Sequence, residues 1–238
     1  MIEAWLLPVP GSVPDLVERV RPGLADWEQA RLERFAFEPD RVLYAAAHGL
    51  LRLALTFRHP SVPVAQWEVE RTAAGALVVI GPVTPTPQVS LSHTKGLVAC
   101  AVAAVPVGID VEAVDPRLDV ASLFERVLSP SERAAWPAPG DAARRRFFQT
   151  WVLKEALLKG LGLGLQCEPA TISVAFSETT PPAIVEMPAA IARPADWGVA
   201  FVDPPPGHVG AVAHRGPPGS AAVAPRLIGL ETLLASFG

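Results

Sequence analysis

The segment FFQTWVLKEALLKGL, residues 147–161, has the pattern of a helix that is apolar almost all the way round. A helix with apolar side chains on every side is typically a buried helix. This one nevertheless carries Lys154, Glu155 and Lys159. A buried charge is normally paired or bound to a ligand, because an unpaired charge is costly in an apolar interior. We therefore interpret the segment as a core helix that contributes to a functional site.

Glu155 and Lys159 are four residues apart, so they lie only about 40° from each other around the helix. An acid and a base on one face of a buried helix favour a site; the alternative is an ordinary ion pair within the helix. Lysine is otherwise rare, since the chain has three lysines against seventeen arginines, and two of the three lie within residues 154–159. This indicates that a compact ammonium group is required there. For Lys154 we expect a structural ion pair.

The composition is that of a soluble globular protein. Its 238 residues, half of them apolar, suit one large domain or two small ones with a sizeable core. The formal charge of −4 argues against nucleic-acid binding through bulk electrostatics. Cys100 and Cys167 do not make a disulfide framework, and both have apolar neighbours. We find no pattern of a secretory signal or a membrane span, and we expect a cytoplasmic monomer.

Short strands and helices follow one another without regular alternation, which favours an α+β fold. Pro106 divides the chain, because the pattern starts afresh after it, and we expect an N-terminal half of residues 1–105 and a C-terminal half of residues 106–238. The predicted strands are residues 2–8, 67–71, 77–80, 89–91, 97–105, 107–112, 171–176, 197–202 and 210–214. The predicted helices are residues 26–35, 40–57, 120–126, one from Ser129 onward and 147–161, with a Pro-rich loop at residues 181–194.

Two acidic residues, Asp110 and Glu112, lie in the predicted strand at residues 107–112. Because side chains alternate along a strand, both carboxylates point to the same face. Mg²⁺ is held by one or two carboxylates and keeps positions for waters and substrate phosphates, so the pair suits this cation. The alternative is the solvent face of an edge strand, where acidic residues are common.

Glu132 has two interpretations. Ser129 as the N-cap, Pro130 at the first helical position and Glu132 three residues after the cap form a capping box. The local residues favour this first interpretation. The second is that Glu132 is a third carboxylate for a metal.

Residues 92–96, Ser-His-Thr-Lys-Gly, separate two predicted strands and contain groups that suit a phosphate. Hydroxyls, the imidazole of His93 and the ammonium of Lys95 can each donate a hydrogen bond to an anion. Arg52, near the end of a largely apolar helix, is a candidate for the same anion, with a simple surface position as the alternative. A lone histidine is also more often a packed or surface residue than a functional one.

Together these motifs resemble those of the Sfp-type 4′-phosphopantetheinyl transferases. The matching residues come in order along the chain: Gly108-Ile109-Asp110-Val111-Glu112, then Glu132, then Trp151-x-x-Lys154-Glu155-x-x-x-Lys159. Ser92-His93-Thr94 and Ala47-His48-Gly49-Leu50-Leu51-Arg52 lie upstream, as in the family. The resemblance covers about residues 35–176. The sequence departs from the family at Gly75-Ala76-Leu77, where the family has a turn that carries a cation.

The resemblance implies a fold and a reaction. The fold would consist of two similar α+β halves packed as an intramolecular pseudo-dimer, with coenzyme A (CoA) and Mg²⁺ bound between them. The reaction would transfer the 4′-phosphopantetheine arm of CoA to a serine of an apo acyl or peptidyl carrier protein. Adenosine 3′,5′-bisphosphate would be released. The carrier would serve fatty-acid, polyketide or nonribosomal peptide synthesis, and the sequence does not say which.

The resemblance also assigns roles to individual side chains. The metal ligands would be Asp110, Glu112 and Glu132. Glu155 would be the general base on the serine hydroxyl, and Lys159 would stabilise the charge that builds on the α-phosphate of CoA. The residues that would bind CoA are Arg52 and His93 at the 3′-phosphate, assisted by Ser92, together with Lys159 and either Lys95 or Arg71 in place of the missing turn cation.

Two other functions stay open on the sequence. A CoA-binding protein without transfer activity, such as a regulatory partner of a carrier-protein enzyme, is suggested by the missing turn cation, whereas the intact acidic set and Glu155 argue against it. A Mg²⁺-dependent phosphohydrolase would use water in place of the serine.

Overall fold

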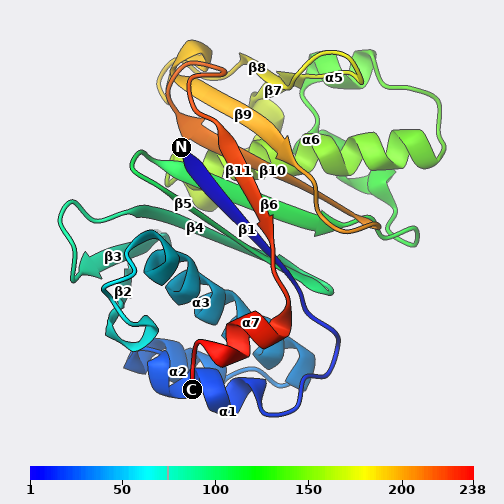
Figure 1. Ribbon diagram of the computed structural model, residues 1–238. Coiled ribbons are helices and arrows are strands. Elements are labelled where there is room, and N and C mark those ends of the chain that lie inside the picture. The colour runs from blue at the N-terminus through cyan, green and yellow to red at the C-terminus, as the bar shows by residue number, and fades with distance from the viewer. Residues whose placement is uncertain (74) are drawn as a thin grey trace.

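Two β-sheets pack face to face in this protein, and a long helix covers the outer face of each (Figure 1). The computed structural model describes residues 1–73 and 75–238. Smaller helices and two two-stranded sheets lie around these four layers. The α+β class predicted from the sequence is confirmed.

The first sheet is built mainly from the N-terminal half of the chain. The elements of this half are β1 (Ile2–Pro8), α1 (Leu16–Val20), α2 (Asp26–Leu32), α3 (Glu38–Arg58), β2 (Glu68–Arg71), β3 (Leu77–Gly81), β4 (Gln88–Thr94) and β5 (Leu97–Ala103). They are joined by β11 (Val223–Leu227) and α7 (Leu230–Ala235) from the end of the C-terminal half. The strand order is β11-β1-β5-β4, with β1 and β11 parallel and the other pairs antiparallel. Helix α3 covers the face of this sheet that points away from the second sheet.

The second sheet comes from the C-terminal half. Its elements are β6 (Val107–Ala113), α4 (Phe124–Val127), α5 (Pro130–Ala134), α6 (Asp141–Gly160), β7 (Ser173–Ala175), β8 (Ala183–Glu186), β9 (Trp197–Val202) and β10 (His208–Arg215). The strand order is β6-β10-β9, and both pairs are antiparallel. Helix α6, which contains the sequence segment predicted to be buried, covers the outer face, and its apolar side chains are indeed buried.

The core between the two sheets consists of small and aliphatic side chains. On β5, Ala99 and Ala101 belong to this core, whereas Cys100 and Val102 belong to the core beneath α3. Both faces of β5 are therefore covered. A strand with two buried faces is apolar at successive positions, and this explains why β5 lacks the alternation of a half-exposed strand.

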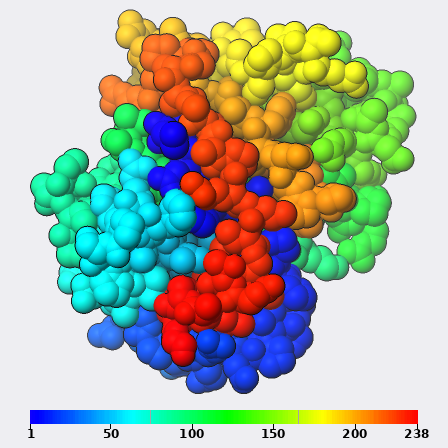
Figure 2. All heavy atoms as spheres, in the orientation of Figure 1, coloured from blue at the N-terminus to red at the C-terminus, as the bar shows by residue number. Residues whose placement is uncertain are grey.

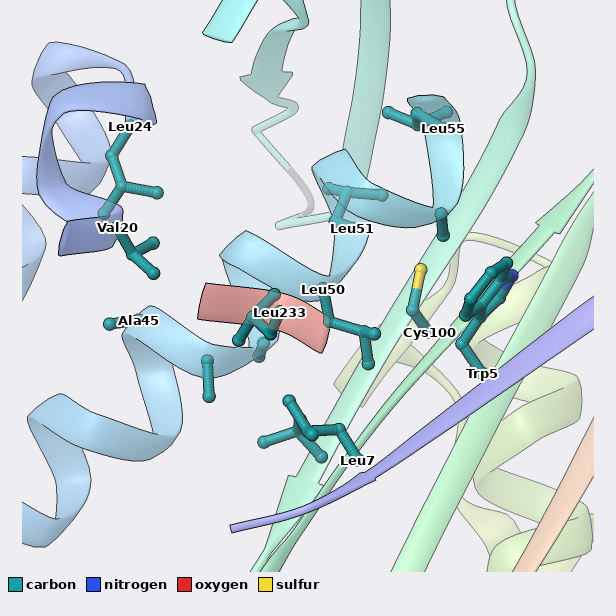
Figure 3. Packing of buried hydrophobic residues seen from close by; sticks show 14 of the residues in the cluster. Trp5, Leu7, Val20, Leu24, Ala45, Leu50, Leu51, Leu55, Cys100 and Leu233 are labelled. Atoms are coloured by element: carbon teal, nitrogen blue, oxygen red, sulfur yellow. The ribbon is translucent and has the colours of Figure 1, made fainter. Parts of the chain in front are cut away.

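The core beneath α3 holds the first half together (Figure 3). Leu50 of α3, Leu7 of β1 and Leu233 of α7 gather in it, and none of the three side chains is exposed. The close-up shows Leu233 beside Leu50, on the side of the core away from Trp5. The last helix of the chain is therefore part of the same core as the first strand.

The C-terminal segment contains two elements that the sequence pattern does not predict, β11 and α7. β11 lies beside β1, with Val223 opposite Ile2 and Leu227 opposite Leu6. Figure 2 shows this segment, in red, running down one face of the molecule from the second half to the first. β11 contains Pro225, which normally argues against a strand. The strand forms because it lies at the edge of the sheet, where the missing N–H of a proline is tolerated.

Three further differences from the sequence pattern concern element bounds. β4 continues to Thr94, so Ser92 and His93 lie on a strand and not in a turn. α6 begins at Asp141, ahead of the predicted start at residue 147. β8 occupies part of residues 181–194, which were expected to be a loop; it pairs with β7 despite the prolines on either side of it.

The chain passes from the first sheet to the second at Pro106. The division into residues 1–105 and 106–238 stays a prediction, and the structure adds that β11 and α7 lie with the first sheet. No helix in the described parts of the chain is both long enough and apolar enough to cross a membrane.

Replacing Leu233 by alanine should destabilise the protein. Its side chain is fully buried against α3, and truncation of a buried leucine costs about 2–5 kcal/mol of unfolding free energy. Urea unfolding followed by circular dichroism measures this loss. The matched control is Leu227→Ala on the same segment, where the side chain is 62% exposed. Equal unfolding midpoints for the two variants would contradict the packing of α7.

Candidate active site

The site depends on a close contact between α6 and β6. A Cβ atom on Gly108 would lie 1.9 Å from the carbonyl oxygen of Ala156 and 2.5 Å from the amide nitrogen of Gly160. Only glycine leaves room for such an approach, so the backbones of the helix and the strand touch here. The contact brings the last turns of α6, with Glu155 and Lys159, against the strand that carries the acidic pair.

Lys159 reaches from α6 to both sheets. Its Nζ donates to Oδ1 of Asp110 at 2.7 Å, to the carbonyl oxygen of Ile109 at 3.2 Å and to that of Leu91 on β4 at 3.3 Å. The three protons of the ammonium group are thus matched by three acceptors. The carboxylate paired with Lys159 belongs to Asp110 and not to Glu155, so the structure favours the site over an ordinary pair within the helix.

Three carboxylates, those of Asp110, Glu112 and Glu155, act on one another electrostatically around Lys159. Burial, and then the charge of Asp110, raises the pKa of Glu112 to about 7. Burial and the charge of Asp110 also raise the pKa of Glu155, although Lys159 opposes this shift. Burial is the larger cause of both shifts, and the neighbouring carboxylate charges add to it. A further cation would therefore be stabilised among these carboxylates.

Asp110 and Glu112 fit the metal site that the sequence predicts. Oδ2 of Asp110 is buried and has no hydrogen-bond partner within the described residues. Among these residues, no three or more histidine, cysteine, aspartate or glutamate side chains are grouped so that they could hold a metal ion. Mg²⁺ needs only one or two protein carboxylates. The pair would therefore leave the other coordination positions to waters and phosphates.

Glu132 lies elsewhere, in the capping box that its local sequence favours. Its Oε2 accepts from the amide of Ser129 at 2.7 Å and from Nζ of Lys154 at 2.6 Å, and its Oε1 accepts from the amide of Val174 at 2.8 Å. Both oxygens are thus engaged, and the structure does not bring Glu132 to Asp110 and Glu112. Lys154 is fully buried in this ion pair, as expected for a structural lysine.

A cavity of about 410 Å³ lies beside Lys159 on the side of the first sheet. Its walls combine aromatic rings and positive charges, from Trp27, Phe35, Tyr44, Arg31, Arg71, His93 and Lys159. His93 and Lys159 thus line the same cavity. Burial, and then the charge of Lys159, lowers the pKa of the His93 ring. Of the two candidates for the missing turn cation, Arg71 lines this cavity.

Arg52 does not line this cavity. Its guanidinium is fully buried and donates to both carboxylate oxygens of Glu28 on α2, and Oε1 of Glu28 also bonds Nδ1 of His48. The arginine therefore serves a buried carboxylate, and the structure does not present its charge to a phosphate. An arginine within an apolar helix requires a buried acidic partner. This need for a partner is the feature of the sequence from which a buried acid such as Glu28 could have been predicted. Arg31, which lines the cavity, has no comparable feature in the sequence.

Two more cavities border the acidic cluster. One of about 480 Å³ is lined by Glu155 and Trp151, and it shares Gly164 with the first cavity. The other, of about 510 Å³, is lined by Glu112 and Lys95. Lys95 and His93 therefore face different cavities, although they are two residues apart.

Ser92 lies on β4, where the first sheet meets β6 of the second sheet. Its side chain is buried, and its Oγ donates to Oδ1 of Asp110 at 2.8 Å. The structure thus brings Ser92 to the acidic pair, where it orients a carboxylate, and not to the cavity that His93 lines.

Comparison with known proteins points to one family. A family model described as the 4′-phosphopantetheinyl transferase superfamily matches residues 106–202, which include β6, α6 and the carboxylates between them. The 4′-phosphopantetheinyl transferase HetI of a Nostoc species is 28% identical over 218 residues, which are 90% of this chain and 88% of the relative. A phosphopantetheinyl transferase of a Thraustochytrium species is 32% identical over 179 residues, which are 69% of this chain and 62% of the relative.

Among solved structures, the holo-[acyl-carrier-protein] synthase of Neisseria meningitidis matches 46% of this chain and 96% of its own chain, with 20% identity and a TM-score of 0.39. The matched family and the named relatives are transferases. The chain is therefore similar to 4′-phosphopantetheinyl transferases along most of its length, and the family resemblance predicted from the sequence is confirmed.

Replacing Gly108 by alanine should separate α6 from β6 and destabilise the protein. The added methyl group would overlap the backbone of α6, which cannot move away as a flexible side chain can. Overpacking of this kind costs about 1–3 kcal/mol or more, and a thermal unfolding scan measures it. Gly11→Ala is the control, because nothing lies within 4 Å of a Cβ at that position. An unchanged melting temperature for Gly108→Ala would contradict the contact.

The pair of Glu28 and His48 should make the protein less stable as the pH falls. Burial lowers the pKa of His48 although Glu28 opposes this shift. Burial acts to raise the pKa of Glu28, but the hydrogen bonds from His48 and Arg52 outweigh it and hold that pKa below its ordinary value. Both groups take up protons more readily in the unfolded chain. Stability is therefore fully present above the ordinary His pKa of 6.5 and is lost progressively below it.

Urea unfolding at pH values above and below 6.5 measures this loss. The matched variant is His48→Gln, since glutamine donates a hydrogen bond to Glu28 but does not titrate. We expect the variant to lose less stability than the parent between about pH 7 and pH 5. The same loss in both proteins would show that His48 does not contribute.

Proposed function

We propose that this protein transfers the 4′-phosphopantetheine arm of CoA to a serine of an apo carrier protein and releases adenosine 3′,5′-bisphosphate. The observation that carries the proposal is the position of the acidic cluster. Asp110, Glu112 and Glu155 lie with Lys159 between a cavity that has cations and aromatic rings and a second cavity lined by Glu155. This arrangement suits an anionic substrate on one side and an approaching hydroxyl on the other.

The first cavity suits the adenosine 3′,5′-bisphosphate part of CoA. Its aromatic rings provide apolar surface for a base, and Arg31, Arg71 and His93 provide positive charge for phosphates. In the family, a cation in the turn at Gly75-Ala76-Leu77 contacts CoA, and its absence here suggested a binding protein without activity. Arg71, which lines the cavity, would supply this charge. The position of Arg71 supports an active transferase over a binding protein without activity.

The acidic pair suits the pyrophosphate of CoA when Mg²⁺ is present. Asp110 and Glu112 would hold the ion, with Glu155 close enough to influence their charge. The metal would neutralise phosphate oxygens and polarise the phosphorus that is attacked. Catalysis of phosphoryl transfer depends mainly on such positioning and neutralisation of charge.

The chain's own residues would then serve the proton and the leaving group. The serine oxygen of the carrier forms a bond to the β-phosphorus of CoA while the bond from that phosphorus to the oxygen of the α-phosphate breaks. Glu155, whose raised pKa suits a general base, would take the serine proton. Lys159 would stabilise the charge left on the α-phosphate, since it already lies at the edge of the first cavity. A monomeric, cytoplasmic enzyme stays our prediction.

The reaction is tested by incubating the protein with CoA, Mg²⁺ and an apo carrier protein, followed by mass spectrometry of the carrier. We expect the carrier to gain the mass of one phosphopantetheine arm, and the gain to disappear when EDTA replaces Mg²⁺. CoA binding without a mass gain on carriers from fatty-acid, polyketide and peptide synthesis would contradict transfer. Breakdown of CoA in the absence of a carrier would instead indicate a phosphohydrolase.

Replacing Glu155 by glutamine should abolish transfer and preserve CoA binding. The amide keeps the shape of the carboxylate but cannot accept the serine proton, and loss of a general base costs about 100-fold to 10,000-fold in rate. Transfer is followed by carrier mass, and CoA binding by calorimetry. Glu168→Gln is the matched control, because Glu168 lines the same cavity and has no assigned role. Full activity of the Glu155 variant would exclude Glu155 as the base.

A further inference from the structure

Three hydroxyl side chains on β4 join the edge of the first sheet to the edge of the second. Ser90, Ser92 and Thr94 occupy alternate positions, and each accepts a hydrogen bond from a backbone amide of β6. The donors are the amides of Ile109, Val111 and Ala113, at 3.1, 3.3 and 3.1 Å. We call these three contacts the hydroxyl ladder. It replaces backbone pairing where the edge strands of the two sheets meet.

Each of the last two rungs of the ladder also holds a carboxylate. A hydroxyl can donate one hydrogen bond while it accepts others. Ser92 donates to Oδ1 of Asp110 at 2.8 Å, and Thr94 donates to Oε2 of Glu112 at 3.2 Å. In each case the carboxylate belongs to the residue that directly precedes the amide donor: Asp110 precedes Val111, and Glu112 precedes Ala113. The two-residue period of β4 therefore matches the two-residue spacing of the acidic pair.

The first rung has no carboxylate to hold. Ser90 accepts from the amide of Ile109, and the residue before Ile109 is Gly108, which has no side chain. Ser90 is thus an internal control that the chain itself provides. It joins the sheets as the other rungs do and also lines the first cavity, but its hydroxyl does not bond the acidic pair, so the comparison of Mn²⁺ affinities is made at saturating CoA.

The ladder leaves one oxygen of each carboxylate free. Oδ1 of Asp110 accepts from both Ser92 and Lys159, whereas Oδ2 is buried with no partner in the described part of the chain. Thr94 occupies Oε2 of Glu112, and the contacts of the described residues leave Oε1 for another partner. Hydrogen bonds of this kind fix the orientation of a metal-binding side chain, and their loss weakens metal binding.

We propose that Ser92 and Thr94 are positioning residues that turn the free oxygens of Asp110 and Glu112 toward the divalent cation, whereas Ser90, which joins the two sheets and lines the first cavity, holds no carboxylate. The inference rests on the proposed function, because that function supplies the cation. It assigns the two hydroxyl residues of the Ser-His-Thr motif, Ser92 and Thr94, a role different from that of His93, which lines the first cavity. The ladder thereby couples the packing of the two halves to the geometry of the acidic pair.

The test uses four variants of the full chain. Ser90→Ala, Ser92→Ala and Thr94→Val each remove one hydroxyl, and valine keeps the shape of threonine. Thr94→Ser restores the hydroxyl at the third rung. Mn²⁺ serves as the probe in place of Mg²⁺, and its binding in the presence of CoA is followed by electron paramagnetic resonance. Urea unfolding is measured for every variant.

We expect Mn²⁺ binding to weaken about tenfold or more in Ser92→Ala and in Thr94→Val, and to stay within about twofold of the parent in Ser90→Ala and Thr94→Ser. The unfolding midpoint should fall in all three variants without the hydroxyl, since each leaves an amide without its acceptor. This division separates positioning from stability, because a purely structural ladder would give Ser90→Ala and Ser92→Ala the same metal affinity. If Ser92→Ala does not fold, the comparison of Thr94→Val with Thr94→Ser decides, since Thr94 is only partly buried.

Equal Mn²⁺ affinity in the parent, Ser92→Ala and Thr94→Val would overturn the inference and leave the proposed function standing. A tenfold loss in Ser90→Ala as well would also overturn it, because the effect would then follow from loosened packing. Absence of Mn²⁺ binding by the parent with CoA present would remove the metal from the proposed function, and with it the role of the ladder. The mass gain of the carrier protein is scored separately, so failure of transfer is recognised independently.

Discussion

The direct contact between the backbones of α6 and β6 is the constraint on which the site depends. Gly108 and Gly160 have no side chains, so the helix lies closer to the strand than any other residue pair would allow. At this distance the side chain of Lys159 can reach past β6 to a carbonyl of β4. One lysine therefore contacts both sheets, and the charge it carries is balanced by Asp110. Without the glycine contact, neither the lysine nor Glu155 would stand beside the acidic pair.

The two sides of the site carry opposite charge. Three carboxylates share one lysine on the side of the second half, while arginines and a histidine line the cavity on the side of the first. An anionic nucleotide placed between them would be drawn toward the first half by direct contacts. Toward the second half it would require a metal ion. If the proposed function holds, the two halves of the protein would contribute different kinds of electrostatic stabilisation to one substrate, despite their similar layers of sheet and helix.

The sequence predicted those features that depend on neighbours along the chain. The burial of α6, the shared face of Asp110 and Glu112 and the capping box at Ser129 all follow from local periodicity or spacing. Partners of buried charges could not be predicted in the same way. Arg52 is bonded to Glu28, and Lys154 is bonded to Glu132, and each of these pairs joins separate helices. The need for a partner was visible in each case, but the identity of the partner depends on the fold.

β11 places nearly the last residues of the chain beside the first. Its register with β1 pairs Val223 with Ile2, so the edge of the first sheet is closed by a strand that is synthesised after all the strands of the second sheet. During synthesis the N-terminal half therefore emerges with an exposed strand edge that stays open until β11 has been synthesised. Pairing over so long a span of sequence is slow, and an open edge is prone to association with other chains. Domains usually fold in order from the N-terminus. Here the first sheet can be completed only after the strands of the second sheet have been synthesised.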